Sequence, residues 1–401
     1  MHVAVLGGGL QGCCVALALA DRGVRVTLFD RNDRLLTRAA VANEGKIHLG
    51  YMYAADPTLN TARRMMRGAL AFAPFMSRRL GVPLDSFALS SPAVYLVHRD
   101  SQQSPEAVAG YVASVQTLLS DLAPEARSSY FGKDLRAPPR RWSDAEQKRT
   151  FHPEDILAAF DSPEAAIDPI ALADMIRSRI AQTPTIELRL NQVVLGVDED
   201  GQRLRVRCDT APESGFDHVV NALWDGRLAV DATLGLKPGR PWLHRLKYGV
   251  IFHAPPGPPR PTSVTVVSGP FGEVVNYEDG TIYLTWYPHC LRALSAETSP
   301  PQWATYPVEP LRSEILEGTI EAMCRIVPAL RAVAPDDPSQ VMVRGGTIVA
   351  WGQSDIYDPA SELHRRFEIG VTSSGRYHSV DPGKLTMAPF FASECATRIA
   401  G

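Results

Sequence analysis

The sequence predicts an α/β fold in which a Rossmann-like nucleotide-binding domain accompanies an α+β substrate domain built on an antiparallel sheet. Three observations lead to this prediction. Near the N-terminus, a short apolar run is followed by a glycine-rich turn and an apolar helix. Four strand-like segments with a hairpin turn occupy residues 247–287. The chain has 401 residues, which is more than one domain of ordinary size requires.

The first element is a strand over Val3–Leu6, because a continuous apolar run is typical of a strand buried on both faces of a parallel sheet. Residues 7–12 follow with the pattern G-x-G-x-x-G, and residues 11–22 have the composition of a helix. Arg25–Phe29 is a second apolar strand, and Asp30 stands at its end. The complete order of strand, turn, helix, strand and Asp indicates a dinucleotide-binding unit.

Each position of this unit has a physical role in binding a dinucleotide. Gly7 permits a tight turn, Gly9 lets the backbone approach a pyrophosphate, and Gly12 allows the helix to pack closely on the strand. The unpaired N–H groups at the helix start attract the phosphates. Asp30 is suited to binding a ribose, and an Asp there disfavours the 2′-phosphate of NADP. FAD and NAD share this pattern, so both remain candidates.

Beyond Asp30 the chain does not repeat simple βαβ units. The predicted helices cover residues 59–80, 105–122, 169–180 and 385–399. The predicted strands outside the antiparallel block cover residues 93–97, 186–190, 192–197, 204–208, 217–222 and 367–372. The antiparallel block consists of residues 247–253, 263–268, 272–277 and 281–287, with Glu278-Asp279-Gly280 as a hairpin turn.

The two domains are expected to be interleaved along the chain. Residues 1–88, 150–235 and 336–401 are assigned to the nucleotide-binding domain, and residues 89–149 and 236–335 to the substrate domain. In this arrangement the strand at Val3 pairs with the strands at 217–222 and 367–372.

Composition excludes several classes of function. The net charge is −3, from 41 basic and 44 acidic residues, so the basic stripe of a nucleic-acid-binding protein is not expected. The six cysteines are scattered without a C-x-x-C pair and the histidines are dispersed, so no metal site is predicted. The N-terminus lacks the pattern of a secretion signal, and the apolar run at 15–20 is too short to span a bilayer. We therefore expect a cytoplasmic protein without a membrane span.

Two further segments carry a resemblance to a known family. Residues 43–48, Asn-Glu-Gly-Lys-Ile-His, are similar to the S-x-x-N-x-G-x-I-H segment of the D-amino acid oxidase superfamily of FAD-dependent oxidoreductases, which includes glycine oxidase and L-2-hydroxyglutarate dehydrogenase. Residues 374–389 resemble the C-terminal G-H-x-x-x-G-hydrophobic-x-x-A-P element of that superfamily. Tyr377-His378 replaces the usual Gly-His, and Asp225-Gly226 replaces small residues, so the chain resembles an off-branch member.

This resemblance implies FAD as the cofactor and a glutathione-reductase-type nucleotide-binding domain. It also implies that residues 43–48 pass beside the flavin and that the turn at Gly383 approaches the N1–C2=O edge. Because a reduced flavin is negatively charged near N1, a helix start and the Lys384 ammonium there would favour reduction. The expected FAD contacts are Gly7, Gly9, Leu10, Gln11, Gly12, Asp30, Arg31, Asn43, Gly45, Lys46, His48, Val194, Gly375, Gly383, Lys384, Leu385 and Thr386.

The expected catalytic residues come from three places. Arg344 lies where members such as glycine oxidase have a carboxylate-binding arginine, and a guanidinium suits a planar carboxylate. Tyr283 and Tyr287 share one face of a predicted strand, facing a cavity over the flavin. His48 and His378 are the candidate bases, because histidine titrates near working pH. Structural roles for these side chains, and a covalent link between His48 and the flavin, stay open.

The expected function is FAD-dependent oxidation of a C–N bond in a small amine or amino acid, by hydride transfer to flavin N5. Oxidation of a hydroxy acid or a sugar-like alcohol is the alternative. An NAD-dependent dehydrogenase and a flavoprotein without turnover are further alternatives. The expected partners are a small-molecule substrate and an electron acceptor, either O2 or another carrier.

Overall fold

The first sheet is organised around the N-terminal apolar run, which forms β1 (His2–Leu6). The computed structural model describes residues 1–122 and 124–401 and gives this sheet six strands in the order β16-β17-β9-β1-β2-β5. β1 pairs in parallel with β2 (Arg25–Phe29) and β9 (His218–Asn221), and β5 (Ile186–Arg189) pairs in parallel with β2. Val3–Leu6 is fully buried, as expected for an internal parallel strand.

The other side of this sheet differs from the expectation. The predicted strand at 367–372 corresponds to β16 (Gly370–Ser374), but β16 does not pair with β1. It forms an antiparallel hairpin with β17 (Tyr377–Asp381), and β17 pairs in parallel with β9. The prediction of direct pairing was wrong because β17 has the polar sequence YHSVD, which lacks the apolar run of an internal strand.

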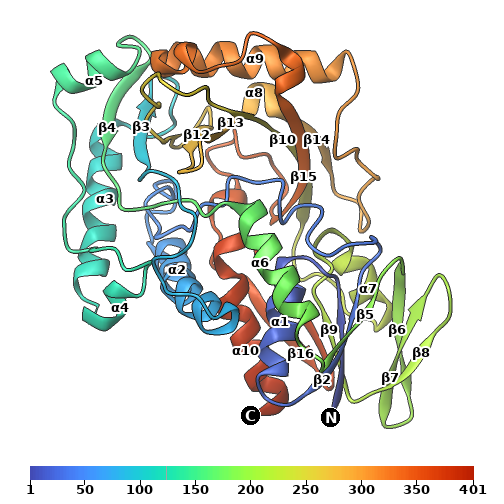
Figure 1. Ribbon diagram of the computed structural model, residues 1–401. Helices are drawn as coiled ribbons and strands as arrows, with labels where there is room; N and C mark the ends of the chain where they lie inside the picture. Colours follow the sequence, from blue (N-terminus) through green and yellow to red (C-terminus); the bar gives the residue numbers. More distant parts are fainter. Residues whose placement is uncertain (123) are drawn as a thin grey trace.

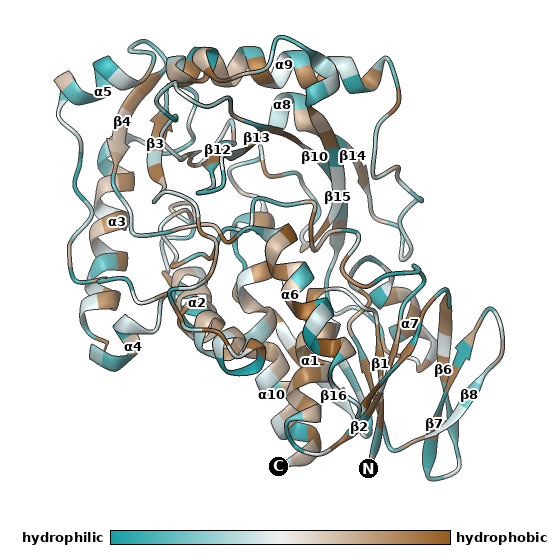
Figure 2. Cartoon of the chain, in the orientation of Figure 1, coloured by the Kyte–Doolittle hydropathy of each residue, from teal (hydrophilic) through white to brown (hydrophobic). Residues whose placement is uncertain are grey.

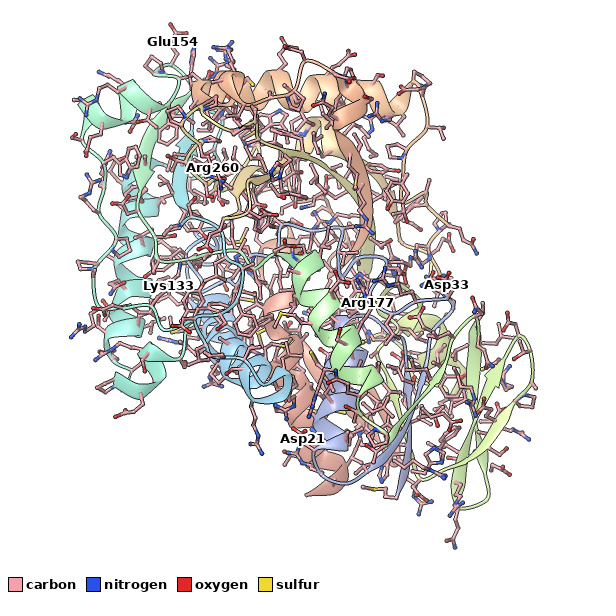
Figure 3. The ribbon with its side chains drawn as sticks, in the orientation of Figure 1. Asp21, Asp33, Lys133, Glu154, Arg177 and Arg260 are labelled. Carbon is pink, nitrogen blue, oxygen red and sulfur yellow. The ribbon has the colours of Figure 1, made fainter. Side chains whose placement is uncertain are left out.

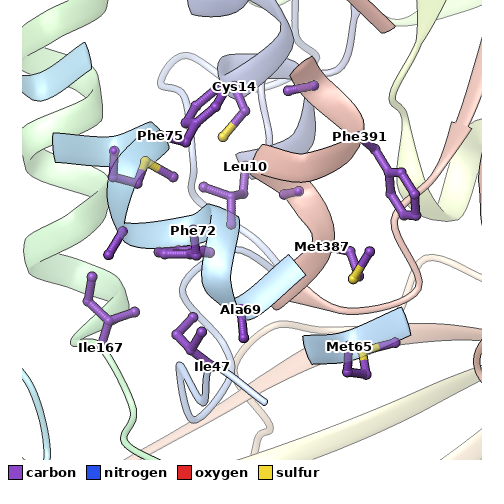
Figure 4. Packing of buried hydrophobic residues seen from close by; sticks show 14 of the residues in the cluster. Leu10, Cys14, Ile47, Met65, Ala69, Phe72, Phe75, Ile167, Met387 and Phe391 are labelled. Carbon is purple, nitrogen blue, oxygen red and sulfur yellow. The ribbon is translucent and has the colours of Figure 1, made fainter. Parts of the chain in front are cut away.

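Four helices cover one face of this sheet and contain much of the main hydrophobic core. They are α1 (Leu10–Ala20), α2 (Asn60–Leu80), α6 (Pro169–Ala181) and α10 (Ala388–Ala400). Leu10 and Cys14 of α1 lie beside Phe72 and Phe75 of α2, with Phe391 of α10 nearby (Figure 4). Both chain ends lie at the same end of the molecule (Figure 1). The start and the end of the chain therefore belong to one structural unit.

The second sheet has eight strands, mostly antiparallel, in the order β14-β10-β13-β12-β11-β3-β4, with β15 also paired to β10. Its strands are β3 (Val94–His98), β4 (Ile156–Phe160), β10 (Trp242–His253), β11 (Val264–Val266), β12 (Gly272–Asn276), β13 (Thr281–Trp286), β14 (Leu291–Ser295) and β15 (Met342–Trp351). Helix α9 (Leu311–Ile326) packs against this sheet, at the top of Figure 1. This sheet contains the predicted antiparallel block.

Strand pairing changes two of the expected domain boundaries. β15 falls within 336–401, which we had assigned to the nucleotide-binding domain, but it pairs with β10 over ten residue pairs in the second sheet. β4 falls within 150–235 and pairs with β3 in the same sheet. Along the chain, each of these two strands stands between a strand of the second sheet and a strand of the first. Which sheet each strand joins therefore depends on long-range pairing rather than on local sequence.

The remaining elements lie at the periphery. A three-stranded sheet of β6 (Val194–Asp200), β7 (Arg203–Cys208) and β8 (Glu213–Phe216) projects from the molecule beside α7 (Arg227–Thr233). Helices α3 (Pro105–Ser120), α4 (Pro124–Ser128) and α5 (Asp144–Thr150) lie along the far side, and α8 (Tyr287–Cys290) follows β13.

The distribution of hydrophobic and hydrophilic residues follows this arrangement of sheets and peripheral elements. Strands inside the sheets are predominantly hydrophobic, whereas the projecting β7 and β8 carry hydrophilic stretches (Figure 2). Charged side chains such as Glu154 and Asp33 are exposed at the outer surface (Figure 3). Among the helices of the described residues, none has the length and apolar character needed to cross a membrane.

Candidate functional site

A cavity of about 600 Å³ extends from the glycine turn after β1 to the second sheet. At one end it is lined by residues 7–11 and Asp30, which belong to the predicted dinucleotide-binding unit. At the other end it is lined by Lys247 of β10, by Arg366 in the segment before β16, and by Lys384 just before α10. Segments from both large sheets therefore form one continuous site.

The glycine turn has the shape expected for binding a pyrophosphate. Gly7 has a φ of +100°, and a Cβ there would lie 2.7 Å from the Ala222 carbonyl oxygen. A Cβ at Gly12 would lie 1.8 Å from the Gly7 carbonyl oxygen, whereas a Cβ at Gly9 would have no atom within 4 Å. Gly9 is the N-cap of α1 without a side-chain hydrogen bond, so the first N–H groups of α1 remain free for a ligand in the cavity.

Asp30 lines the cavity and also fixes the turn. Its carboxylate accepts a hydrogen bond from the Gly8 N–H at 2.7 Å and another from the Asn32 N–H at 2.8 Å. Close by, Arg31 and Arg38 both form ion pairs with Asp225, at 3.2 and 3.1 Å. The unusual Asp225 thus anchors two arginines at the cavity.

The segment 43–48 enters the cavity through a loop whose shape is set by two residues. The Asn43 side chain accepts a hydrogen bond from the Gly45 N–H at 2.7 Å and donates one to the Ala39 carbonyl at 2.8 Å. Gly45 has a φ of +67°, and a Cβ there would lie 1.9 Å from the Ile167 carbonyl oxygen. Gly45 does not line the cavity, so its role is to shape the loop that does.

Two buried ion pairs lie in this part of the site. The Lys247 ammonium lies 3.1 Å from the Glu44 carboxylate, and the Lys46 ammonium lies 2.8 Å from Glu273. Burial raises the pKa of Glu44, but Lys247 and Lys384 outweigh it and hold this pKa well below its usual range. Lys46 and Lys247 are therefore paired cations.

His48 lines the cavity and has a buried carboxylate behind it. Its Nδ1 lies 3.4 Å from Oε2 of Glu164, which is completely buried. The other Glu164 oxygen accepts the N–H groups of Leu49 and Gly50, at 2.7 and 2.9 Å, and Tyr95 donates its hydroxyl to Oε2. Burial lowers the pKa of His48, and Glu164 opposes this shift. The lowered pKa favours the neutral form of the His48 imidazole.

The turn before the last helix brings Lys384 into the cavity. Gly383 has a φ of +58°, and a Cβ there would lie 2.8 Å from the Ile369 side chain. Burial lowers the pKa of Lys384 to about 8. The predicted helix at 385–399 begins as a 3-10 turn, Leu385–Met387, and continues as α10. Thr386 does not line the cavity, but its hydroxyl accepts the His48 N–H at 3.0 Å.

Two arginines that we had not assigned to the site also line the cavity. The Arg245 side chain is 1% exposed, and within the described part of the chain its buried Nε and Nη1 have no hydrogen-bond partner. The Asp355 carboxylate lies 3.7 Å from Nη1. Arg366 donates hydrogen bonds to the carbonyls of Leu363 and Val349, both at 3.2 Å.

Besides Gly12, Gly45 and Thr386, four more of the predicted site residues lie outside the cavity. Arg344 donates to the Thr37 carbonyl at 3.3 Å, and His378 contacts the ring of His218 within the first sheet at 3.1 Å. Gly375 forms the exposed turn between β16 and β17. Tyr283 is buried beneath Lys247, with the ammonium 5.8 Å from its ring.

Other predicted residues do line the cavity. Tyr287 lines the cavity, although it belongs to α8 rather than to the preceding strand. The remaining predicted FAD contacts that line the cavity are Gly7, Gly9, Leu10, Gln11, Asp30, Arg31, Asn43, Lys46, His48, Val194, Gly383, Lys384 and Leu385. Glu164 was missed, although an isolated glutamate in the otherwise mostly apolar run ILAAFDSPEAAI was a usable signal. In the described residues, no cluster of three or more histidine, cysteine or carboxylate side chains suits a metal ion.

Comparison with known proteins identifies the family. Residues 2–377 match the family model described as FAD dependent oxidoreductase, and the chain belongs to this family. The chain is 24% identical over 289 residues to the FAD-dependent monooxygenase FPY4 of Fusarium mangiferae; the match covers 71% of the chain and 63% of that protein.

Solved structures share the fold at low identity. Glycine oxidase from Geobacillus kaustophilus matches with a TM-score of 0.69 and 14% identity, covering 99% of this chain and 94% of that one. L-α-glycerophosphate oxidase from Mycoplasma pneumoniae, solved with FAD bound, matches with a TM-score of 0.66 and 16% identity, covering 100% and 94%. Together with the family match, these structures confirm the expected recognition, fold class and cofactor.

The residues present fit FAD. The open space at Gly9 and the uncapped start of α1 suit the pyrophosphate, and Asp30 suits the ribose. At the other end, the Lys384 ammonium suits the negative charge that a reduced flavin carries near N1.

Proposed function

We propose that this FAD-dependent oxidoreductase oxidises the C–N bond of a small amino acid whose carboxylate binds Arg245. The observation that carries this proposal is the buried Arg245 side chain, whose Nε and Nη1 lack acceptors among the described residues. Asp355, at 3.7 Å, is too far to accept a hydrogen bond from Nη1, and a substrate carboxylate offers the buried guanidinium two parallel charge-assisted hydrogen bonds. Arg245 thus takes the role that the sequence suggested for Arg344.

FAD, when bound, supplies the acceptor for the hydride that leaves the α-carbon. The protein orients the substrate through Arg245, and His48 accepts the proton from the substrate ammonium, because a neutral imidazole is a competent base. Loss of this proton and of the hydride converts the substrate ammonium to a protonated imine. The nearby Glu164 carboxylate stabilises the imidazolium that forms.

A second candidate function is oxidation of a hydroxy acid at the same site. The pairing of His48 with the buried Glu164 favours it, because removing a hydride from an alcohol requires a base for the hydroxyl proton. The same Arg245 contact serves the carboxylate of either substrate. O2 and another electron carrier both remain candidate acceptors in this proposal.

The experiment is anaerobic titration of the purified holoenzyme with amino acids, amines and hydroxy acids, followed by flavin absorbance. We expect bleaching by at least one amino acid, with an imine or its hydrolysis product formed. Bleaching by hydroxy acids alone would establish the second candidate, and bleaching by none would contradict both. Hydrogen peroxide release on admission of air would identify O2 as the acceptor.

A matched pair of substitutions tests the role of Arg245. Arg245→Met is expected to raise the apparent KM for the bleaching substrate about 10–100-fold, since charged hydrogen bonds contribute about 1.5–3 kcal/mol. Arg245→Lys should recover part of this loss. Arg344→Met, on the neighbouring strand but outside the cavity, is the control and should leave KM within about twofold. Equal effects of Arg245→Met and Arg344→Met would reject the assignment.

A further inference from the structure

The cavity end near the second sheet contains more positive than negative charge. Its five cations are Lys46, Lys247, Lys384, Arg245 and Arg366. Lys46 and Lys247 are balanced by Glu273 and Glu44 at ordinary ion-pair distances of 2.8 and 3.1 Å. The other three cations have no carboxylate this close among the described residues. Lys384 suits the charge of the reduced flavin, so two guanidinium groups remain for a substrate: Arg366, and Arg245 with only the longer 3.7 Å contact to Asp355.

Arg366 is held by neutral acceptors. Its Nε and Nη1 donate to the carbonyls of Leu363 and Val349, and Nη1 also reaches the Gly383 carbonyl at 3.5 Å. These contacts fix the orientation of the guanidinium without supplying negative charge. Burial, followed by the nearby Arg245, lowers the pKa of Arg366 to about 10. The positive charge of Arg245 therefore disfavours the charged form of Arg366.

Further polar groups at this end lack partners. The hydroxyls of Tyr53 and Ser268 are buried and make no hydrogen bond to the described residues, and both residues line the cavity. Each is a hydrogen-bond donor of the kind that accompanies an arginine in binding a carboxylate. The site thus combines excess positive charge with unused donors.

We infer that the substrate is a dianion, with one carboxylate on Arg245 and a second anionic group on Arg366. An amino acid or hydroxy acid with an acidic side chain has this chemistry. This inference rests on the proposed function in one respect: the proposed function supplies the assignment of the first carboxylate to Arg245. A purely structural Arg366, which merely holds three carbonyls, predicts no preference for a second negative charge.

The test is a binding measurement on the oxidised holoenzyme. Propionate, malonate, succinate and glutarate are titrated at constant ionic strength, and the change in the absorbance of bound FAD gives each Kd. We expect at least one dicarboxylate to bind tenfold or more tightly than propionate, and this advantage to shrink as salt is raised. If no dicarboxylate binds more tightly than propionate, the inference is wrong.

Substitutions assign the second subsite. Arg366→Gln should leave the Kd of propionate within about twofold but abolish the advantage of dicarboxylates, whereas Arg245→Met should weaken both classes. Arg366→Lys, which keeps the charge, should restore part of the advantage. A dicarboxylate advantage that survives in a folded, FAD-loaded Arg366→Gln protein would overturn the assignment to Arg366. The ligand series on the unmodified protein does not depend on any variant folding.

The outcome is separable from that of the proposed function. If amino acids bleach the flavin but dicarboxylates bind no better than propionate, the dianion inference is wrong and the oxidation proposal stands. If dicarboxylates bind better but no amino acid or hydroxy acid bleaches the flavin, the subsite stands and the oxidation proposal is wrong.

Discussion

Gly9 and Gly12 lie three residues apart, yet an added methyl group should affect them in opposite ways. At Gly9 the added Cβ would have no protein atom within 4 Å, and the backbone φ of −75° suits alanine. We therefore expect Gly9→Ala to leave the stability of the apoprotein unchanged within about 0.5 kcal/mol. The methyl group occupies space where the pyrophosphate approaches, so FAD affinity should fall at least tenfold. Equilibrium dialysis against FAD measures this change.

Gly12→Ala is the comparison. Its Cβ would lie 1.8 Å from the backbone oxygen of Gly7, which is not free to move because Gly7 is itself constrained by Ala222. Overpacking of this kind costs about 1–3 kcal/mol, so the apoprotein should unfold at lower denaturant concentration. Equal stability of the two variants, or normal FAD affinity in Gly9→Ala, would show that the turn does not bind as we describe.

The local sequence pointed to some residues of the cavity more clearly than to others. Asp30, His48 and Lys384 could be singled out because each belongs to a local motif with a fixed spacing, and all three line the cavity. Arg344, which we had predicted as a catalytic residue, lies outside the cavity for a geometric reason. In the pairing of β15 with β10 it lies opposite Gly249, four residues beyond Arg245 along β10. Those four residues correspond to about 13 Å of strand, which local sequence cannot reveal.

At the scale of elements, two helical glycines make a second pair of predictions. Gly68 of α2 packs on the turn that precedes α10: a Cβ there would lie 2.3 Å from Met387 Sδ and 3.0 Å from the Thr386 carbonyl oxygen. Gly68→Ala gains about 1 kcal/mol of helix propensity, but it crowds this contact. We expect a net loss of about 1–2 kcal/mol in the free energy of unfolding.

Gly110 in α3 is the matched control. It is exposed, and a Cβ there would have no atom within 4 Å. Gly110→Ala should therefore stabilise the protein by about 0.5–1 kcal/mol through helix propensity alone. Denaturant unfolding of both variants gives the comparison, and a stabilised Gly68→Ala would mean that α2 and the turn at Met387 are not closely packed.

Elements with a strong local signal were predicted well. β2 has the predicted bounds, and α1, α2 and α6 differ from prediction by one or two residues at either end. β17 was missed because its five buried residues include His378, Ser379 and Asp381, so its burial comes from its neighbours in the sheet. Partners that lie far apart in the chain, such as β10 and β15, are determined by tertiary packing.

At the scale of the whole molecule, one cavity joins the two large sheets. Gly7–Gln11 follows β1, Arg245 and Lys247 belong to β10, and Lys384 precedes α10. A cofactor that spans this cavity binds only the folded arrangement of all three segments. Its binding should therefore stabilise the entire fold, by about 2.7 kcal/mol when free FAD is 100 times its Kd.

Hydrogen exchange of the apoprotein with and without FAD tests this linkage. We expect added protection in three peptides, which contain residues 7–12, 245–247 and 383–388, because each contributes to the wall of the cavity. A peptide from α3, over residues 105–120, is the internal control, since none of its residues lines the cavity. Protection limited to residues 7–12 would mean that the cofactor contacts the glycine turn alone. In that case the excess charge around Arg245 and Arg366 would lie apart from the flavin, and a substrate held there could not transfer its hydride.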